Sequence, residues 1–509
     1  MKKSSNLSRV METENHLKNR TNPKSQTSRK KLLPGAILMC LLWAIPLMAN
    51  AQTWQIGSNV TATLSSGTLT ISGTGDMASY SSDNQPWYSQ RANINALVIQ
   101  SGVTSISAQA FNNCTNLQTV TIEDGTVALR FVGSYGYGHF TNSPIETLYL
   151  GRDLETAYIG GDYSNGSPFN ENTALQSLTI GKDVTTINDN SFQNCTGLQS
   201  LTVGIAIITI GNNAFYNCSR LAGALTIPNK VKTIGSGAFQ GCRVLPSVSI
   251  PNSVTSIGSQ AFNGCTNLQT VSIEDGTVTL RFVGSYGYGH FTNSPIETLH
   301  LGRDLETAYI GGDYSNGSPF NENTALQSLI IGKDVTTIND NSFQNCTRLT
   351  GITIPSNITS IGSSAFSGCR FKEIHSKNPN PPSAVDGCFS DMYATCKLYV
   401  PIGSGKAYET ATEWIKFFDN GNGFEENTNG IDKVLTDQLS IFPNPVINEL
   451  FIKSELPVKK VEIYSQAGSL LIQENNFTEK ISVSALPKGV YLLKVYTGKS
   501  MAVSKFVKE

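Results

Sequence analysis

Hydrophobic and polar positions along most of this chain follow a unit that repeats about every 23 residues. The unit contains Ala/Ser-Phe-x-x-Cys followed by Leu-x-x-Val-x-Ile. Its Val and Ile are two residues apart and share one face of a strand, so intervening residues such as Thr119 and Thr121 point outward. A second short extended piece precedes each Phe, as in Val254-x-x-Ile257-Gly258, where the glycine permits a turn. One unit is therefore predicted to be a coil with two extended segments and two turns.

The spacing of the phenylalanines predicts twelve such coils. Seven carry the full Phe-x-x-Cys motif, and they are Phe111/Cys114, Phe192/Cys195, Phe215/Cys218, Phe239/Cys242, Phe262/Cys265, Phe343/Cys346 and Phe366/Cys369. Four more lie in the two long gaps of 81 residues, which they divide into steps of 29, 29 and 23: Phe140, Phe169, Phe291 and Phe320. Phe389 marks a last, degenerate coil. Because one coil cannot close a core alone, stacking predicts a β-rich solenoid, roughly 55–60 Å long at about 4.8 Å per coil.

A larger duplication lies on top of the repeat. Residues 103–198 and 254–349 match at an offset of 151, with eight differences over 96 positions. The differences include Tyr149/His300, Thr179/Ile330 and Gly197/Arg348. The surface is therefore predicted to display similar patches twice, which favours bivalent binding.

The amino-terminal segment is predicted to be a signal peptide, residues 1–51. A basic stretch precedes the apolar run Leu32–Met48, and small residues at 49 and 51 suit cleavage between Ala51 and Gln52. The alternative is a transmembrane anchor, but the run is short and contains Pro34 and Pro46. No other segment is apolar and long enough to span a bilayer, so no stable transmembrane span is expected.

Charge separates this leader from the rest of the chain. Residues 1–51 hold nine Lys/Arg and two Glu, which leaves 28 basic and 36 acidic residues after them, a net charge of −8. A mildly acidic mature protein is a poor candidate for binding nucleic acid or anionic membranes.

The repeat resembles that of a known family. The stretch from Ile234 to Pro251 is similar to the repeat of BspA-like leucine-rich-repeat surface proteins of bacteria. Residues 52–100, with Pro86-Trp87-Tyr88, resemble the amino-terminal cap segment of that family, and residues 397–414 resemble its carboxy-terminal cap. The resemblance implies a leucine-rich-repeat solenoid over residues 101–420. It also implies adhesion, binding of host proteins and aggregation.

The pattern changes near the carboxy end. Residues 421–435 are rich in Asn, Gly and Glu and are predicted to be a linker. Alternating strands are expected at residues 449–452, 458–464, 469–472 and 490–496, which indicates a small β-sandwich over residues 436–509. The opening motif Phe442-Pro443-Asn444-Pro445, the segment 489–495 and the basic tail Lys505–Lys508 resemble the type A sorting domain of the type IX secretion system. That resemblance implies passage to the cell surface with the secretion machinery as a partner; the alternative is an ordinary appended sandwich.

The cysteines are expected to be mostly buried thiols. The seven motif cysteines form a regular apolar column that needs no bonds, although stacked neighbours lie within disulfide reach. Cys388 and Cys396 are outside the column, and a bridge between them is an open alternative. A line of thiols does not suit a tetrahedral metal site, so no metal or other cofactor is predicted.

Catalysis is not predicted. The histidines after the leader are His139, His290, His300 and His375, and no Ser or Cys has a recognisable base partner. The repeated segment Asp162–Gly166, which recurs from Asp313, is attributed to turn chemistry rather than to calcium.

The best candidate for binding is an aromatic segment that occurs twice. It contains Tyr135, Tyr137 and His139 in the first copy and Tyr286, Tyr288 and His290 in the second. Glycines between the rings suit an exposed turn, and Tyr is favoured in recognition surfaces. The alternative is that the rings only cover the core of the lengthened coils. The chain is thus expected to bind host or bacterial surface proteins, with glycans as the alternative ligands.

Overall fold

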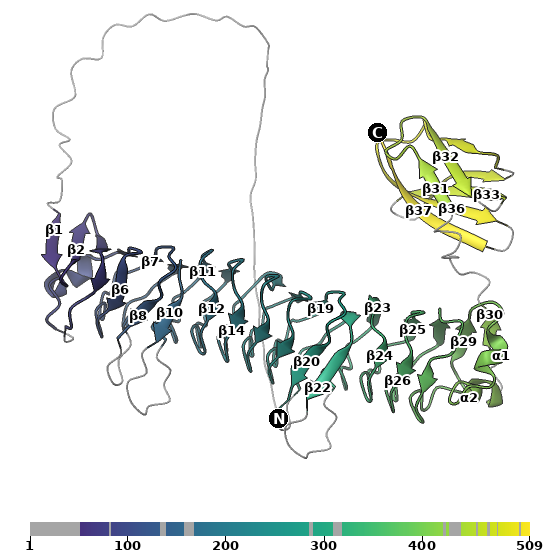
Figure 1. Ribbon diagram of the computed structural model, residues 1–509, viewed down its shortest axis with the longest axis horizontal. Helices are drawn as coiled ribbons and strands as arrows, with labels where there is room; N and C mark the ends of the chain where they lie inside the picture. The colour runs from purple at the N-terminus through teal and green to yellow at the C-terminus, as the bar shows by residue number, and fades with distance from the viewer. Residues whose placement is uncertain are drawn as a thin grey trace, which may run out of the picture. The chain divides into compact units, whose positions relative to one another are not determined.

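The computed structural model describes residues 51–80, 83–132, 139–156, 167–284, 289–308, 318–420, 424–426, 439–454, 457–465, 469–475, 477–497 and 500–509. The described residues up to 426 form a row of stacked coils (Figure 1). The predicted β-rich solenoid of twelve coils is confirmed.

One side of the solenoid, here called the main face, consists of the strands predicted from Leu-x-x-Val-x-Ile. Neighbouring strands that pair are parallel, in three consecutive sheets, and their register is regular except for a shift between Leu301 and Arg303 where β21 pairs with β23. The strands are β5 (Ala96–Ile99), β7 (Thr119–Ile122), β9 (Thr147–Leu150), β11 (Ser177–Ile180), β13 (Ser200–Thr202), β15 (Leu225–Thr226), β17 (Ser247–Ile250), β19 (Thr270–Ile273), β21 (Thr298–Arg303), β23 (Ser328–Asp334), β25 (Gly351–Ile354), β27 (Glu373–Ser376), β29 (Lys397–Val400) and β30 (Phe424–Glu426).

The second side of the solenoid consists of shorter parallel strands that correspond to the extended piece before each Phe. They are β4 (Gly75–Asp76), β6 (Val103–Ile106), β8 (Leu129–Phe131), β10 (Leu154–Thr156), β12 (Thr186–Ile187), β14 (Thr209–Ile210), β16 (Thr233–Ile234), β18 (Ser256–Ile257), β20 (Leu280–Val283), β22 (Leu305–Ala308), β24 (Thr337–Ile338), β26 (Ser360–Ile361) and β28 (Ser383–Ala384). Gly258, at the end of β18, has no room for a side chain, because an added Cβ would lie 2.3 Å from the backbone nitrogen of Ser236. The glycine therefore serves the close approach of neighbouring coils rather than an unusual backbone angle.

The core is a ladder of aromatic rings between the two faces. All twelve phenylalanines are buried, and consecutive rings stack with centroids 5.1–6.3 Å apart. Trp87 stacks on Phe111 at one end, and Trp414 packs against Phe389 at the other. Each indole N–H donates to a backbone carbonyl, so both large side chains are buried with their polar atom satisfied.

Left-handed residues form the corners of the coils. They stand two positions before and two positions after each motif Phe, and Asn or Gly fills most of them. The duplicated blocks show why these two residues interchange: Asn113 has φ 57° and its counterpart Gly264 has φ 70°. Some of the asparagines also form side-chain ladders, such as Asn217 Nδ2 to Asn194 Oδ1 at 3.0 Å.

The two ends of the solenoid are closed differently. At the amino end, an antiparallel meander of β1 (Gln52–Gln55), β2 (Val60–Ser65) and β3 (Thr68–Gly73) precedes the 3-10 helix η1 (Tyr88–Asn93) and covers the first parallel strand. At the other end, the short helices α1 (Gly405–Tyr408) and α2 (Ile415–Asp419) bring Trp414 into the core. These caps protect sheet edges that would otherwise invite association.

The carboxy-terminal residues form two antiparallel sheets. One contains β31 (Leu439–Phe442), β32 (Glu449–Ser454) and β35 (Lys480–Ser482). The other contains β34 (Leu470–Asn475), β33 (Lys460–Ser465), β36 (Gly489–Thr497) and β37 (Ser500–Lys508). They enclose their own core, which includes Leu450, Ile481, Ile463 and Leu493. The predicted sandwich is confirmed, but Lys505–Lys508 is not a free tail, because it belongs to β37, which pairs along its whole length with β36.

Candidate functional site

The main face presents a long, uncharged row of side chains. One outward-pointing residue of each strand from β7 to β25 belongs to a row along this face: Thr121, Tyr149, Thr179, Thr202, Thr226, Ser249, Ser272, His300, Ile330 and Thr353. Neighbours in the row are cross-strand partners except between Thr202 and Thr226 and between Ile330 and Thr353, where one sheet ends and the next begins. This set, called the outward row, contains no Asp, Glu, Lys or Arg. At about 4.8 Å per strand it spans roughly 40 Å. Its hydroxyl groups suit hydrogen bonding to a partner over a broad area.

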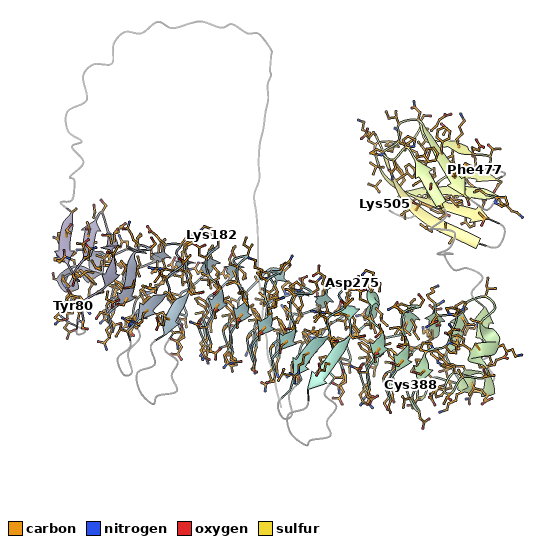
Figure 2. The ribbon with its side chains drawn as sticks, in the orientation of Figure 1. Tyr80, Lys182, Asp275, Cys388, Phe477 and Lys505 are labelled. Atoms are coloured by element: carbon orange, nitrogen blue, oxygen red, sulfur yellow. The ribbon has the colours of Figure 1, made fainter. Side chains whose placement is uncertain are left out.

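Two positions in the outward row contact an aspartate of the preceding coil. Tyr149 donates its hydroxyl to Asp124 Oδ1 at 2.7 Å. In the second copy His300 replaces the tyrosine, and its Nε2 lies 3.7 Å from Oδ1 of Asp275. Lys182 Nζ lies 3.5 Å from Asp124 Oδ2, and Figure 2 shows Lys182 and Asp275 along the same side of the row of coils. The duplicated site therefore keeps its aspartate while the outward residue changes.

The four predicted binding tyrosines, Tyr135, Tyr137, Tyr286 and Tyr288, lie outside the described residues. The structure does place the strands from which their segments start. In the first copy β8 and β10 pair in parallel, and in the second copy β20 and β22 pair in the same way. Strands β8 and β20 therefore precede the two tyrosine segments, and their neighbours β10 and β22 precede Asp162–Gly166 and its repeat from Asp313. These last two segments are also outside the described residues.

His139 and His290 lie in the core rather than on a display surface, with only 5% and 4% of their surfaces exposed. Their Nε2 atoms lie 2.9 and 3.1 Å from the carbonyls of Val132 and Val283. Each ring packs edge-on against the phenylalanine of the adjacent strand, Phe131 or Phe282. Burial lowers the pKa of both imidazoles to about 4, so both are neutral at pH 7. They are positioned to hold the long coils together and not to touch a ligand.

The sequence interpretation missed a buried brace in the long coils. Arg152 and Arg303 are fully buried, and burial lowers the pKa of each guanidinium. Arg303 donates to the carbonyls of Pro251 and Asn252, two coils earlier, at 3.0 and 2.9 Å. The available signal was an arginine two residues after the predicted strand, Arg152 in the first copy and Arg303 in the second.

The adjacent aspartates extend the brace in the opposite direction. Asp153 accepts from the backbone N–H groups of Thr185 and Thr186 at 2.7 and 2.9 Å. Asp304 makes the same contacts in the second copy. Arginine and aspartate together fix each long coil against the coils before and after it.

The described cysteines are free, buried thiols. Within the column each thiol from Cys195 onward donates to the carbonyl of the ladder Phe in the preceding coil, for example Cys195 to Phe169 at 3.2 Å. Burial raises the pKa of Cys195 to about 12, which suppresses the thiolate. Cys388 and Cys396 are also free, so the alternative of a bridge between them is not confirmed.

In the part of the chain that the structure describes, no group of three or more His, Cys, Asp or Glu side chains is placed to hold a metal ion. In the same residues, no helix has the length and apolar character that a membrane crossing requires.

The motif Phe442-Pro443-Asn444-Pro445 ties the start of its domain to the last strand. Asn444 Oδ1 accepts from the backbone N–H of Val507 at 2.9 Å, and its Nδ2 donates to the Lys505 carbonyl at 3.3 Å. Phe442 is half exposed and stacks on Phe451 with centroids 5.7 Å apart. Asn444 thus has a direct structural role, while much of Phe442 stays accessible.

Comparison with protein families gives two matches. The model described as "BspA type Leucine rich repeat region" matches in six copies, over residues 84–222, 165–294 and 316–410. The model described as "Secretion system C-terminal sorting domain" matches residues 440–509. The sorting domain indicates export to the cell surface or the extracellular space. Neither family is enzymatic: one supplies binding modules and the other a signal read by the secretion machinery.

Several solved structures are similar to the chain. They include leucine-rich-repeat proteins from Eubacterium ventriosum (22% identity, 63% of this chain and 95% of that chain, TM-score 0.26) and from Bacteroides ovatus (17% identity, 74% and 98%, TM-score 0.34). A leucine-rich cell surface protein from Faecalibacterium prausnitzii is 20% identical over 71% of this chain and 98% of that chain, with a TM-score of 0.24. No curated protein matches the chain.

Proposed function

Because the chain belongs to the BspA-type leucine-rich-repeat family, we propose that it is a secreted or cell-surface adhesin that binds proteins of a host or of neighbouring bacteria. The observation that carries this proposal is the outward row, a set of uncharged side chains across ten strands of the stacked coils. A standard interface buries about 800 Å² on each partner. A row roughly 40 Å long offers room for such an interface.

The route to the surface is part of the proposal. A signal peptide cleaved between Ala51 and Gln52 would leave β1 as the first element, since that strand begins at Gln52. The carboxy-terminal domain, proposed as residues 436–509, would then direct passage across the outer membrane. Deletion of 436–509 is expected to trap the protein in the periplasm, measured by fractionation. Surface exposure of the truncated protein would contradict this route.

Binding is tested with the purified mature chain on immobilised extracellular proteins and, in parallel, on a glycan array. Saturable binding to proteins supports the proposal. Binding to glycans alone would overturn it. The variant Val385→Ala is the control, because Val385 is exposed and lies outside the outward row. It shows how much any change of an exposed side chain affects binding.

Glycan binding is the second candidate, and one specific observation favours it. Strands β8 and β10, which precede the first tyrosine segment and Asp162–Gly166, pair in parallel, and β20 and β22 pair in the same way six coils later, about 29 Å away. Tyrosine rings displayed at that spacing would suit a sugar polymer. Loss of glycan binding after Tyr135→Ala, Tyr137→Ala and the equivalent changes at Tyr286 and Tyr288 would support this candidate.

We do not propose an enzymatic activity. The buried histidines are neutral and the thiols are protonated, so neither is a ready base or nucleophile. Turnover of a substrate by the purified chain in a hydrolase screen would contradict this view.

A further inference from the structure

Three of the eight differences between the duplicated blocks form one contiguous patch. They are Thr121/Ser272, Tyr149/His300 and Thr179/Ile330. In the first copy Tyr149 is the direct cross-strand partner of both threonines, and in the second copy His300 is the partner of Ser272 and Ile330. None of the six residues is buried. Differences that are far apart in sequence therefore meet on the outward row.

These three differences alter the chemistry of the patch. The first copy presents two threonines and a tyrosine, and the Tyr149 hydroxyl already donates to Asp124. The second copy presents Ile330, which is 53% exposed, beside an imidazole. The charged residues next to the two patches are the same in sequence, because Asp124 corresponds to Asp275 and Lys182 corresponds to Lys333. The two patches thus differ mainly in one apolar side chain and one ring.

The exposed isoleucine indicates the kind of ligand. Ile330 gains little from folding, since more than half of it remains in water. Removal of this apolar surface from water by an apolar group of a partner would be favourable. A neutral glycan offers mostly hydroxyl groups there, whereas a protein can offer an apolar side chain. The replacement of a threonine by Ile330 therefore favours a protein.

We propose that the patch Ser272–His300–Ile330 determines specificity for a protein partner that presents an apolar side chain to Ile330 and a hydrogen-bond acceptor to His300. The equivalent patch of the first copy lacks this specificity, so the duplicated surface binds such a partner once rather than twice. This inference rests on the proposed function as a protein-binding surface.

The duplication supplies matched variants for the test. The first variant, Ser272→Thr with His300→Tyr and Ile330→Thr, gives the second copy the residues of the first. The second variant, Thr121→Ser with Tyr149→His and Thr179→Ile, makes the reverse change. Each new residue already occupies the same environment in the other copy, so both variants are expected to fold, and thermal melting checks this.

The probe is a phage-displayed library of random peptides, selected on the full mature chain and measured by calorimetry. Enriched peptides are expected to contain an apolar residue and to bind with a stoichiometry of one. The first variant should weaken binding by about tenfold or more, the scale of losing one buried aliphatic side chain. The second variant should raise the stoichiometry to two.

The outcomes distinguish a wrong assignment of the patch from a wrong proposal of protein binding. Peptides that bind both variants with the same affinity and stoichiometry as the unaltered chain would overturn the assignment of the patch. They would not contradict the proposed protein binding. A second variant that folds but gains no site would also overturn it. A library that yields no binding peptide at all would count against the proposed protein-binding function itself.

Discussion

Acid should loosen the long coils through their buried histidines. His139 and His290 are enclosed in the core, and their Nε2 atoms are bound to the carbonyls of Val132 and Val283. A protonated imidazole at either position would be a charge buried in the apolar core, which burial disfavours. Lowering the pH from 7 to 4 is therefore the perturbation that acts most directly on these coils.

The size of the effect follows from the two pKa values. Burial lowers the pKa of each histidine from 6.5 to about 4 in the folded state. The unfolded chain therefore takes up the proton first, so the stabilisation is complete above about pH 6.5 and is lost as the pH falls toward 4. At 1.36 kcal/mol per pKa unit, each histidine accounts for about 3 kcal/mol.

Urea unfolding followed by circular dichroism at pH 7, 5 and 4 measures this loss. The double variant His139→Ala, His290→Ala should flatten the dependence on pH relative to the unaltered chain. Alanine suits the site, because Ala214 and Ala238 occupy the same position in other coils. Val385→Ala, at an exposed position without a titratable group, is the control and should leave the slope unchanged. An unaltered slope in the double variant would refute the reasoning.

Three further predictions concern packing and secretion. Phe239→Ala should destabilise the solenoid by about 3–5 kcal/mol in denaturant unfolding, whereas the exposed Val244→Ala should change it by less than about 0.5 kcal/mol. The nine cysteines of residues 52–509 should resist a thiol reagent in the folded chain and all react after denaturation; a count of seven would mean that a disulfide, such as one between Cys388 and Cys396, is present. Asn444→Ala should remove two hydrogen bonds to the last strand, speed proteolysis of that strand and lower the secreted fraction; secretion and proteolysis at the normal rates would argue against this role.

The repeat was predictable because its signals are local and periodic. The spacing of Phe, Cys and Leu predicted the twelve coils, the free-thiol column and the two faces, since each coil repeats the same contacts with its neighbours. The turn chemistry was predictable only in part. Gly258 was expected at a flexible turn, whereas the structure uses it where two backbones approach closely.

The site was less predictable because its contacts cross coils. His139 and His290 were expected on a display surface from their Gly- and Tyr-rich surroundings. Their position directly before a ladder Phe, where other coils have a buried alanine, was the better guide. Arg303 reaches carbonyls 51 and 52 residues earlier, and no local pattern contains that partnership. The patch Ser272–His300–Ile330 could likewise be recognised only from the strand register, which brings its residues together.

The central claim is that the exported solenoid attaches its cell to proteins on another surface. The most direct measurement is the fraction of producing bacteria that remain on a monolayer of host cells while purified mature chain is added as a competitor. The unaltered chain should displace the bacteria in a dose-dependent way, and the variant Ser272→Thr, His300→Tyr, Ile330→Thr should do so much more weakly. Attachment that neither chain reduces, and that persists in bacteria lacking the protein, would contradict the claim.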